Sequence, residues 1–282
     1  MNFLFPILAA FLQTGSVVLD KTILSFKKFD FRTYVGVSFP LSFFITLFIF
    51  ILFRPPLSVE LFFGWSLGLI LLSCAITIIT NVLYYRALSF EDLSEMETLG
   101  LLTAIPAIIF SSFIFPDERN YYILIPALVS SLAILWSHWE KRHFKIAKKT
   151  LPFFIWAFSA APLSAALSKV LLISWNPISL EVVRSGITAL AIWLMFAKAA
   201  KRVSIRNFSL LFLTNIFTTV AWLLFYFSYQ RLGIVHTALL FSLQPFLVYA
   251  SAVLILKEPF HWKKTIAFLV VLLSIAAAQV MS

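Results

Sequence analysis

Charge is what this sequence has least of. Only 12% of its 282 residues are Asp, Glu, Lys or Arg, whereas a soluble globular domain carries about 25%. Hydrophobic residues make up 61%, among them 32 Phe and 8 Trp, and the mean hydropathy is +0.98. So few charges cannot build the polar shell of a water-soluble protein of this length, which argues against a soluble enzyme and against a nucleic-acid-binding protein. We expect the surplus apolar surface to face lipid.

Several functional motifs are also missing. Cys74 is the single cysteine and lies inside an apolar stretch, which leaves no disulfide framework and no cysteine-based metal site. No apolar stretch contains a His-x-x-x-His or paired-aspartate motif, so the sequence does not indicate an enzyme. No basic segment precedes the first apolar stretch, which argues against a signal peptide. We therefore expect no metal and no cofactor.

Long apolar stretches dominate what is present. A membrane helix needs about 20 apolar residues, and continuous apolar runs favour helices over the alternating strands of a membrane barrel. Nine runs are free of Asp, Glu, Lys and Arg: 1–19, 33–53, 61–85, 98–116, 120–137, 150–168, 207–230, 232–256 and 265–282. A tenth stretch, 178–197, is interrupted only by Glu181 and Arg184. The sequence predicts an all-α, multi-pass membrane protein with ten transmembrane helices.

A basic connection divides these stretches into two groups of five. Residues 138–149 form the longest polar stretch, between a first repeat at 1–137 and a second at 150–282. Leu-Asp-Lys at 19–21 corresponds to Leu-Ser-Lys at 167–169. Because each half has an odd number of spans, the second copy would run inverted through the membrane. Inverted repeats are typical of transporters with a substrate site between the halves.

Several motifs resemble the drug/metabolite transporter superfamily, in particular proteins with two EamA-type domains. The motifs are residues 84–88 (Tyr-Tyr-Arg-Ala-Leu), Pro106 with 117–119 (Asp-Glu-Arg), 226–233, 244–245 (Gln-Pro) and 257–259 (Lys-Glu-Pro). The resemblance implies a ten-helix bundle with a central cavity that moves small metabolites by alternating access. It also implies cytoplasmic termini, whereas the distribution of Lys and Arg over the loops favours termini on the outside. The orientation therefore stays open.

Intramembrane cations are the first candidates for substrate binding, because a charge in the middle of a membrane helix costs about 2.5–3.5 kcal/mol. Lys169 lies more than a turn inside its stretch, and Lys21 occupies the equivalent place in the first half. Together with Arg184 they would attract a carboxylate or a phosphate. Alternatively, the two lysines extend to the interface and keep their charge in water. Glu181 is one turn from Arg184, and this spacing favours a pair that neutralises itself.

Uncharged polar and aromatic residues inside the stretches are further candidates. Amides either hold helices together or bind a substrate, and aromatic rings either wall a cavity or face lipid. The substrate-binding candidates of this kind are Asn81, Tyr85, Trp222, Tyr226 and Gln244. Glu95 and His236 occupy equivalent places in the two halves and are candidates for proton coupling. The alternative for an acid at this position is stabilisation of a helix amino terminus.

The function that fits these features is secondary transport of a small organic metabolite, with an amino acid or an organic acid favoured. The alternatives are export of cationic or neutral lipophilic drugs and, less well supported, a membrane-embedded enzyme or a receptor. No Gly-x-x-x-x-Gly-Lys loop is present, so a gradient would drive transport. The expected partners are a small-molecule substrate and the lipid bilayer of the cell membrane, with no nucleic acid. The chain would work as a monomer or a homodimer.

Overall fold

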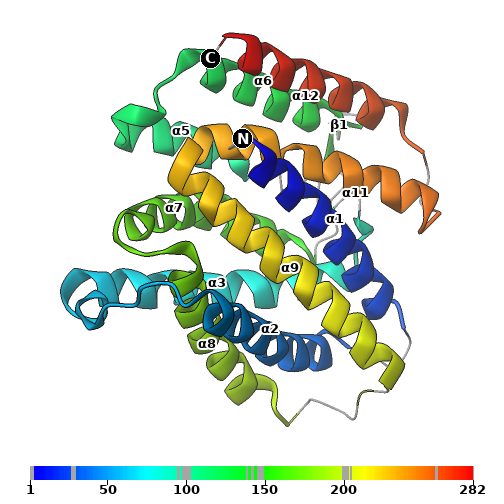
Figure 1. Ribbon diagram of the computed structural model, residues 1–282. Coiled ribbons are helices and arrows are strands. Elements are labelled where there is room, and N and C mark those ends of the chain that lie inside the picture. Colours follow the sequence, from blue (N-terminus) through cyan, green and yellow to red (C-terminus); the bar gives the residue numbers. More distant parts are fainter. Residues whose placement is uncertain are drawn as a thin grey trace.

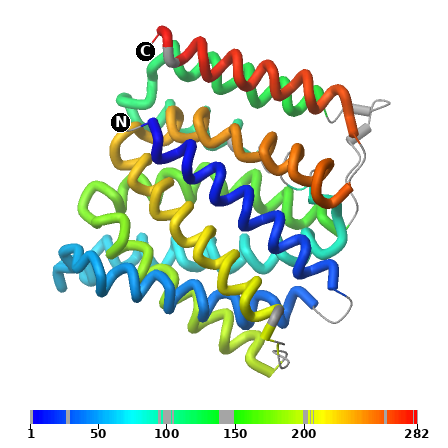
Figure 2. The backbone as a smooth tube through the Cα atoms, turned by 45° about the vertical axis from the view of Figure 1, so that its right-hand side comes forward, coloured from blue at the N-terminus to red at the C-terminus, as the bar shows by residue number. Residues whose placement is uncertain are grey.

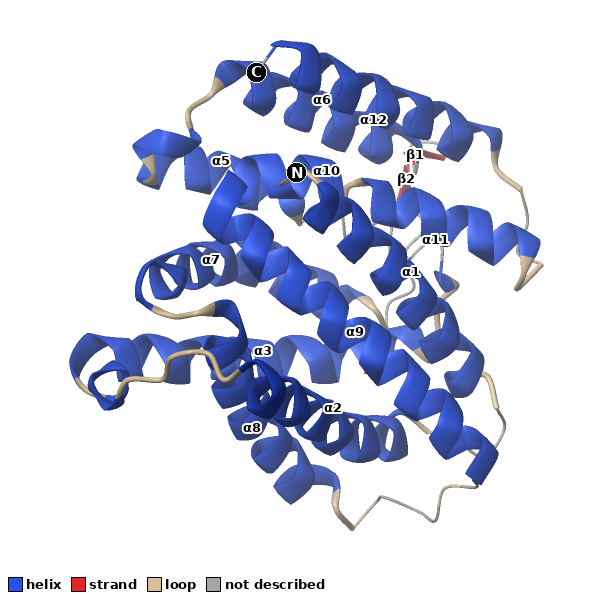
Figure 3. Cartoon of the chain, in the orientation of Figure 1, coloured by secondary structure: helices blue, strands red, loops and turns tan. Residues whose placement is uncertain are grey.

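A computed structural model describes residues 3–26, 30–93, 96, 103–137, 139–140, 143–144, 149–198, 203, 205–257 and 260–281. These residues form a bundle of α-helices (Figure 1). The helices of the first half are α1 (Leu4–Leu24), α2 (Phe31–Phe53), α3 (Gly64–Leu88), α5 (Ala104–Ile114) and α6 (Tyr121–Ser137), with 3-10 helices η1 (Val59–Phe62) and η2 (Pro116–Glu118). Two antiparallel strands of two residues each, β1 (Trp139–Glu140) and β2 (His143–Phe144), follow α6 (Figure 3).

The second half begins with α7 (Leu151–Ser174), α8 (Pro177–Phe196) and α9 (Ile205–Leu232), and it ends with α12 (Trp262–Met281). Between them lie α10 (Ile234–Phe241) and α11 (Leu243–Leu254), which are interrupted at Ser242. Pro245 explains the interruption, because proline has no N–H and its ring collides with the carbonyl group four residues earlier, here that of Phe241.

The structure confirms the all-helical, multi-pass class but not the number of spans. Helices of sufficient length and apolar character are α1, α2, α3, α7, α8, most of α9 and the α10–α11 segment, seven in the part of the chain that the structure describes. The apolar helices at Ile105–Ile114 and Tyr121–Ser137 are shorter. Ten spans, the inverted orientation of the repeats and the division at 138–149 stay predictions.

Local sequence signals set the ends of two helices near the candidate site. The Asp30 carboxylate accepts a hydrogen bond from the backbone N–H of Thr33 at 2.9 Å and caps α2. The Asn176 side chain accepts from the N–H of Ile178 at 2.9 Å and caps α8, which begins with Pro177. Proline suits the first position of a helix and disfavours helical backbone before it. Asn176 and Pro177 therefore separate α7 from α8.

Helices of one half pack mainly on helices of the other. α1 packs on α9 while α3 packs on α7, and α1 contacts α11 while α5 contacts α7. α2 pairs with α8, and α6 pairs with α12 at the edge of the bundle (Figure 2). This reciprocal pairing is what two repeats of similar structure would produce. It also places the centre of the bundle between the halves.

The outer surface is apolar. Trp65 is 90% exposed and Phe48 67% exposed, and many other large hydrophobic side chains are also exposed. Such a surface would be unfavourable in water and matches a lipid environment. Inside, fully buried Tyr34 and Trp175 belong to two different core clusters.

One buried carboxylate joins three elements. Glu118, at the end of η2, accepts hydrogen bonds from the backbone N–H groups of Ile234 and Val235 at 2.7 and 2.9 Å, at the start of α10. Lys169 of α7 forms an ion pair with the same carboxylate. Gly233, with φ of +81°, allows this close approach. Glu118 therefore connects the first half of the chain to two helices of the second.

We expect Gly233→Ala to destabilise the protein. The added methyl carbon would lie 2.6 Å from Glu118 Oε1, in a backbone conformation that L residues rarely adopt, and such strain costs about 1–3 kcal/mol. The melting temperature in detergent, followed by tryptophan fluorescence, measures the effect. Gly68→Ala in α3 is the control, because no atom lies within 4 Å of its added carbon. Equal stability of the two variants would contradict the role of Gly233.

Candidate functional site

A cavity of about 470 Å³ lies between the two halves. This volume is within the usual range of about 300–1,000 Å³ for small-molecule sites. Residues from α1, α2, α3, α5, α7, α8, α9, α10 and α11 line it. Six of the predicted substrate-binding residues are on its wall: Asn81, Tyr85, Arg184, Trp222, Tyr226 and Gln244. Residues separated by more than 160 positions in the sequence therefore meet at one site.

Arg184 of α8 is the cation of this cavity. Its guanidinium donates hydrogen bonds to the Tyr226 hydroxyl at 2.8 Å and to Thr77 Oγ1 at 3.1 Å, and it lies 5.2 Å from the centre of the Tyr226 ring. The side chain is 5% exposed, and its Nε is buried without a hydrogen-bond partner. Two neutral hydroxyls thus hold the guanidinium in place but leave its positive charge without a bonded anion.

Glu181 also lines the cavity, one helical turn before Arg184. The sequence predicts that these two residues neutralise each other, but in the structure they form no direct ion pair. Glu181 makes no hydrogen bond with any residue that the structure describes, although its charge acts on that of Arg184. The spacing of i and i+3 places both residues on one helix face, but it does not by itself bring the charged groups into contact.

Aromatic residues of α9 form one side of the cavity. The rings of Trp222 and Tyr226 have centroids 5.9 Å apart, and Phe225 lies 4.6 Å from Tyr229. Phe241 of α10 packs edge-on against Phe225 at 4.8 Å. These rings give the cavity an apolar surface that adjoins Arg184. The sequence identifies Trp222 and Tyr226 but gives no signal that separates Phe225, Tyr229 and Phe241 from the lipid-facing aromatic residues.

Amide side chains complete the polar part of the wall. Asn81 donates to the carbonyl oxygen of Thr77 at 2.9 Å, so part of its hydrogen-bonding capacity serves its own helix. Gln244 is 5% exposed, next to the break between α10 and α11. Gln13 of α1 also lines the cavity, and its Oε1 is buried without a partner.

Tyr85 connects the cavity to a buried carboxylate that the sequence-based candidates do not include. Asp20, 1% exposed, accepts hydrogen bonds from Tyr34 at 2.5 Å, Thr214 at 2.6 Å and Tyr85 at 3.3 Å. These donors come from α2, α9 and α3. The sequence shows an acid just beyond an apolar run, next to Lys21, but it gives no sign of the three hydroxyls that surround this acid.

The structure does not bring Lys21 and Lys169 into the cavity wall. Lys21 donates to the backbone carbonyl oxygens of Leu88, at 3.0 Å, and Glu91. Lys169 pairs with Asp117 and Glu118 and lies 4.7 Å from the centre of the Phe115 ring. Both ammonium groups are therefore engaged by protein groups that lie far from them in the sequence.

Of the two proton-coupling candidates, the structure describes only His236. His236 is on α10, is 8% exposed, and has its ring centroid 5.3 Å from that of Phe3. It is not among the residues that line the cavity. Glu95 lies outside the described residues, as do Glu258 and Pro259 of the Lys-Glu-Pro motif.

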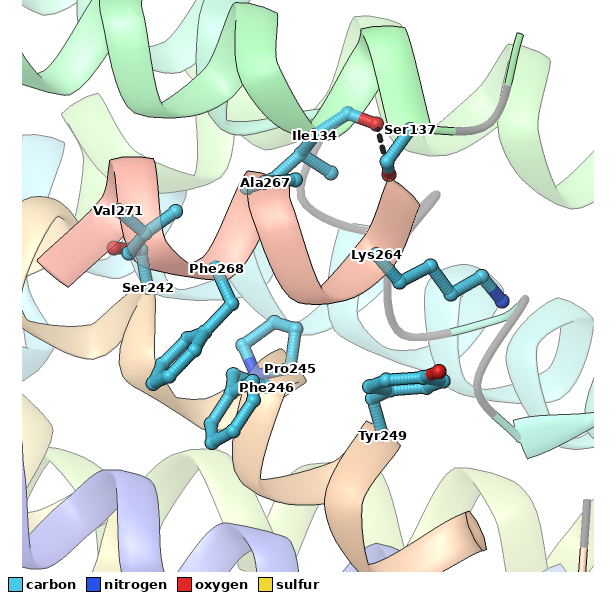
Figure 4. A pocket seen from close by; sticks show the side chains of 10 residues that line it. All are labelled: Ile134, Ser137, Ser242, Pro245, Phe246, Tyr249, Lys264, Ala267, Phe268 and Val271. Carbon is cyan, nitrogen blue, oxygen red and sulfur yellow. Dashed lines mark hydrogen bonds between the residues drawn. The ribbon is translucent and has the colours of Figure 1, made fainter. Parts of the chain in front are cut away.

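A second pocket is much smaller. It lies between α6, α11 and α12, with Phe246 and Phe268 on one side and Tyr249 and Lys264 on the other (Figure 4). Its volume of about 30 Å³ accommodates a water molecule but not an organic substrate. Among the described residues, no group of three or more His, Cys, Asp and Glu side chains is placed to hold a metal ion. The large cavity is therefore the candidate site.

A comparison with known protein families gives a match for the second half of the chain. Residues 149–278 match the family described as the EamA-like transporter family. This half of the chain is therefore similar to EamA-like transporters. The resemblance to drug/metabolite transporters is thereby confirmed, and Arg184, Trp222, Tyr226 and Gln244 lie within the matched residues. The EamA match indicates a multi-pass membrane transporter rather than an enzyme.

A solved structure supports the fold of the whole chain. It is described only as a crystal structure of a protein, and it superposes with a TM-score of 0.75 at 15% sequence identity. The alignment covers 99% of this chain and 96% of that one. At this identity the likeness shows the fold alone, but it extends beyond the EamA match into the first half. No curated protein matches the chain.

We expect Asp20→Asn to destabilise the protein, because an amide accepts fewer hydrogen bonds than a carboxylate and adds donors beside three hydroxyls. Hydrogen bonds to a charged group contribute about 1.5–3 kcal/mol. Thermal unfolding in detergent measures the loss. Asp30→Asn is the control, since asparagine caps a helix as well as aspartate does. A variant at Asp20 as stable as the variant at Asp30 would show that the cluster contributes little.

Proposed function

We propose that the chain is a secondary transporter that carries a small organic metabolite with a carboxylate group, an amino acid or an organic acid, across the cell membrane. The observation that carries this proposal is the Arg184 guanidinium, held by two hydroxyls on the wall of the cavity, with a buried Nε that lacks a partner. Such a donor favours a ligand that accepts hydrogen bonds and bears a negative charge.

A carboxylate is the best match for this group. Guanidinium binds carboxylates through paired hydrogen bonds, and the hydroxyls of Tyr226 and Thr77 orient the guanidinium of Arg184. Because Arg184 is only 5% exposed, the attraction is stronger than it would be at a surface. Lys21 and Lys169 are no longer needed for the proposal, since each already has protein partners.

The remainder of the substrate would contact the aromatic residues. Trp222, Phe225 and Tyr229 provide apolar surface beside Arg184, and aromatic surfaces favour aliphatic and aromatic groups. The cavity volume of about 470 Å³ favours a metabolite over a polymer. The Gln13 side chain of α1, whose Oε1 is buried without a partner, offers a further hydrogen-bonding group.

The position of the cavity between two sets of reciprocally paired helices supports a mechanism of alternating access. A movement of one half against the other would open the cavity first to one side of the membrane and then to the other. The interrupted α10–α11 segment contributes Ile234, Ala238, Phe241 and Gln244 to the wall, so a bend at Ser242 would change the shape of the site.

An exporter of cationic drugs is the second candidate, and one observation favours it. The Glu181 carboxylate lacks a hydrogen-bond partner among the described residues and shares the cavity with Trp222, a good surface for a cation. Arg184 opposes this function, because a second positive charge in the cavity would be repelled. The two candidates therefore predict opposite ligand charges.

We expect Arg184→Met to weaken the binding of carboxylate ligands strongly. In a thermal-shift measurement on purified protein in detergent, amino acids, organic acids, nucleosides and cationic drugs are compared at equal concentrations, since ligands that bind the folded state raise the melting temperature. Loss of a charged hydrogen-bonding partner weakens binding about ten- to hundredfold. Arg86→Met is the control, because Arg86 is exposed at the end of α3.

Stabilisation of the wild type by carboxylates that is lost only in Arg184→Met supports the proposal. Stabilisation by cationic compounds alone would favour the drug exporter instead. Carboxylate binding that survives Arg184→Met and is lost in Lys169→Met would return the role to the lysine and contradict the assignment made here.

A further inference from the structure

Glu181, which is half-buried on the cavity wall, differs from the buried acids Asp20 and Glu118 in having no bonded partner among the described residues. Asp20 accepts from three hydroxyls, and Glu118 accepts from two backbone N–H groups and an ammonium. Glu181 lines the cavity and makes no hydrogen bond or ion pair with the described residues. A carboxylate left this way inside a membrane protein is costly, so its retention in α8 suggests a use.

Few charged or titratable groups face this carboxylate. Those that act on it are Arg184 on its own helix, Cys74 of α3 and Tyr226 of α9. The helices α2 and α7, which also pack against α8, contribute only serine, alanine and phenylalanine side chains to the cavity. Arg184 is therefore the one permanent charge among the described neighbours of Glu181.

The two charges balance each other while the cavity is empty. A substrate carboxylate that binds Arg184 would disturb this balance, since two negative groups would then share one guanidinium in a low-dielectric site. Like charges at close range favour protonation of one of them. The binding site has to be reoriented from one side of the membrane to the other in both its empty and its loaded state. Because it lies in the apolar interior of the membrane, this reorientation costs least free energy when the site carries no net charge.

We infer that Glu181 is the compensating group of the transport cycle: it takes up one proton when a monocarboxylate binds to Arg184, and it binds the ammonium group when the substrate is an amino acid. This inference rests on the proposed function, because Arg184 must hold the substrate carboxylate. The proton comes from the water on the side to which the cavity is open. It leaves, with the substrate, on the opposite side.

Substrate and proton would then move in the same direction. Because binding linkage is reciprocal, protonation of Glu181 raises the affinity for the monocarboxylate by the same factor by which the monocarboxylate favours protonation. An amino acid brings its own positive charge and needs no proton. The same site would thus couple an organic acid to the proton gradient and leave an amino acid uncoupled.

The test uses two ligands that differ by one ammonium group, phenylalanine and 3-phenylpropionate. Affinities for the purified protein are measured by calorimetry between about pH 6 and pH 8, where both carboxylates stay ionised and the ammonium group of phenylalanine stays protonated. Titrations in buffers of different ionisation enthalpy give the number of protons taken up. The variants are Glu181→Gln, Arg184→Met and, to exclude the thiol, Cys74→Ser. Glu60→Gln, at an exposed position on η1, is the matched control.

For the wild type, Glu60→Gln and Cys74→Ser, we expect 3-phenylpropionate to bind with proton uptake and to lose affinity by up to about tenfold per pH unit as the pH rises. In Glu181→Gln it should bind without proton uptake and with a flat pH profile. Phenylalanine should bind the wild type without proton uptake and should bind Glu181→Gln at least about tenfold more weakly, because an ammonium loses its anion.

The outcomes separate the two proposals. Binding of 3-phenylpropionate that needs Arg184 but takes up no proton at any pH, or takes up a proton equally in Glu181→Gln, would overturn the role of Glu181 and leave the proposed function intact. Binding of both ligands that is unchanged in Arg184→Met would overturn the proposed function itself.

Discussion

Inside a membrane a charged side chain has no water to solvate it, and this constraint organises the whole molecule. Asp20 accepts hydrogen bonds from hydroxyl groups of three other helices. Glu118 accepts hydrogen bonds from two backbone N–H groups and forms an ion pair with Lys169. Each of these carboxylates, which lie in the first half of the chain, thus bonds to at least one group of the second half. In the described structure the helices are held in register by the need to satisfy these charges, while apolar packing against lipid-like surfaces gives little preference for one neighbour over another.

The same constraint makes the cavity recognisable. The hydrogen-bonding capacity of the Arg184 guanidinium is only partly used. Two hydroxyls orient it, but no carboxylate of the described structure bonds to it and its Nε has no partner. Glu181 is less satisfied still. Since the structure elsewhere provides partners for buried acids, the two incomplete charges on one face of α8 are better explained by a ligand than by imperfect packing. The site is therefore recognised by polar groups that lack hydrogen-bond or ion-pair partners among the described residues.

The sequence predicted the helices and most of the cavity wall, for a physical reason. Apolar runs give the length and depth of a helix, so Arg184, Tyr226 and Gln244 stood out as polar groups within a span. An apolar run does not show which group a polar side chain within it will bond to. Lys169 had the right depth, but its ammonium bonds to Asp117 and Glu118, about fifty residues earlier. Helical spacing likewise placed Glu181 beside Arg184 but could not show that they fail to pair. The rotation of each helix, which decides these contacts, depends on all its neighbours at once.

The relation between Lys169 and Arg184 shows how the fold separates two tasks. Both are cations on adjacent helices of the EamA-like half, α7 and α8. Lys169 is neutralised by two acids of η2, and through Glu118 it stabilises the start of α10. Arg184 is held by neutral hydroxyls, which fix its orientation and leave its charge available. A cation paired with an acid stabilises a structure, whereas a cation oriented by neutral groups retains its affinity for an anion. The partner of each residue, more than its charge or its depth, therefore decides which of them can bind a substrate.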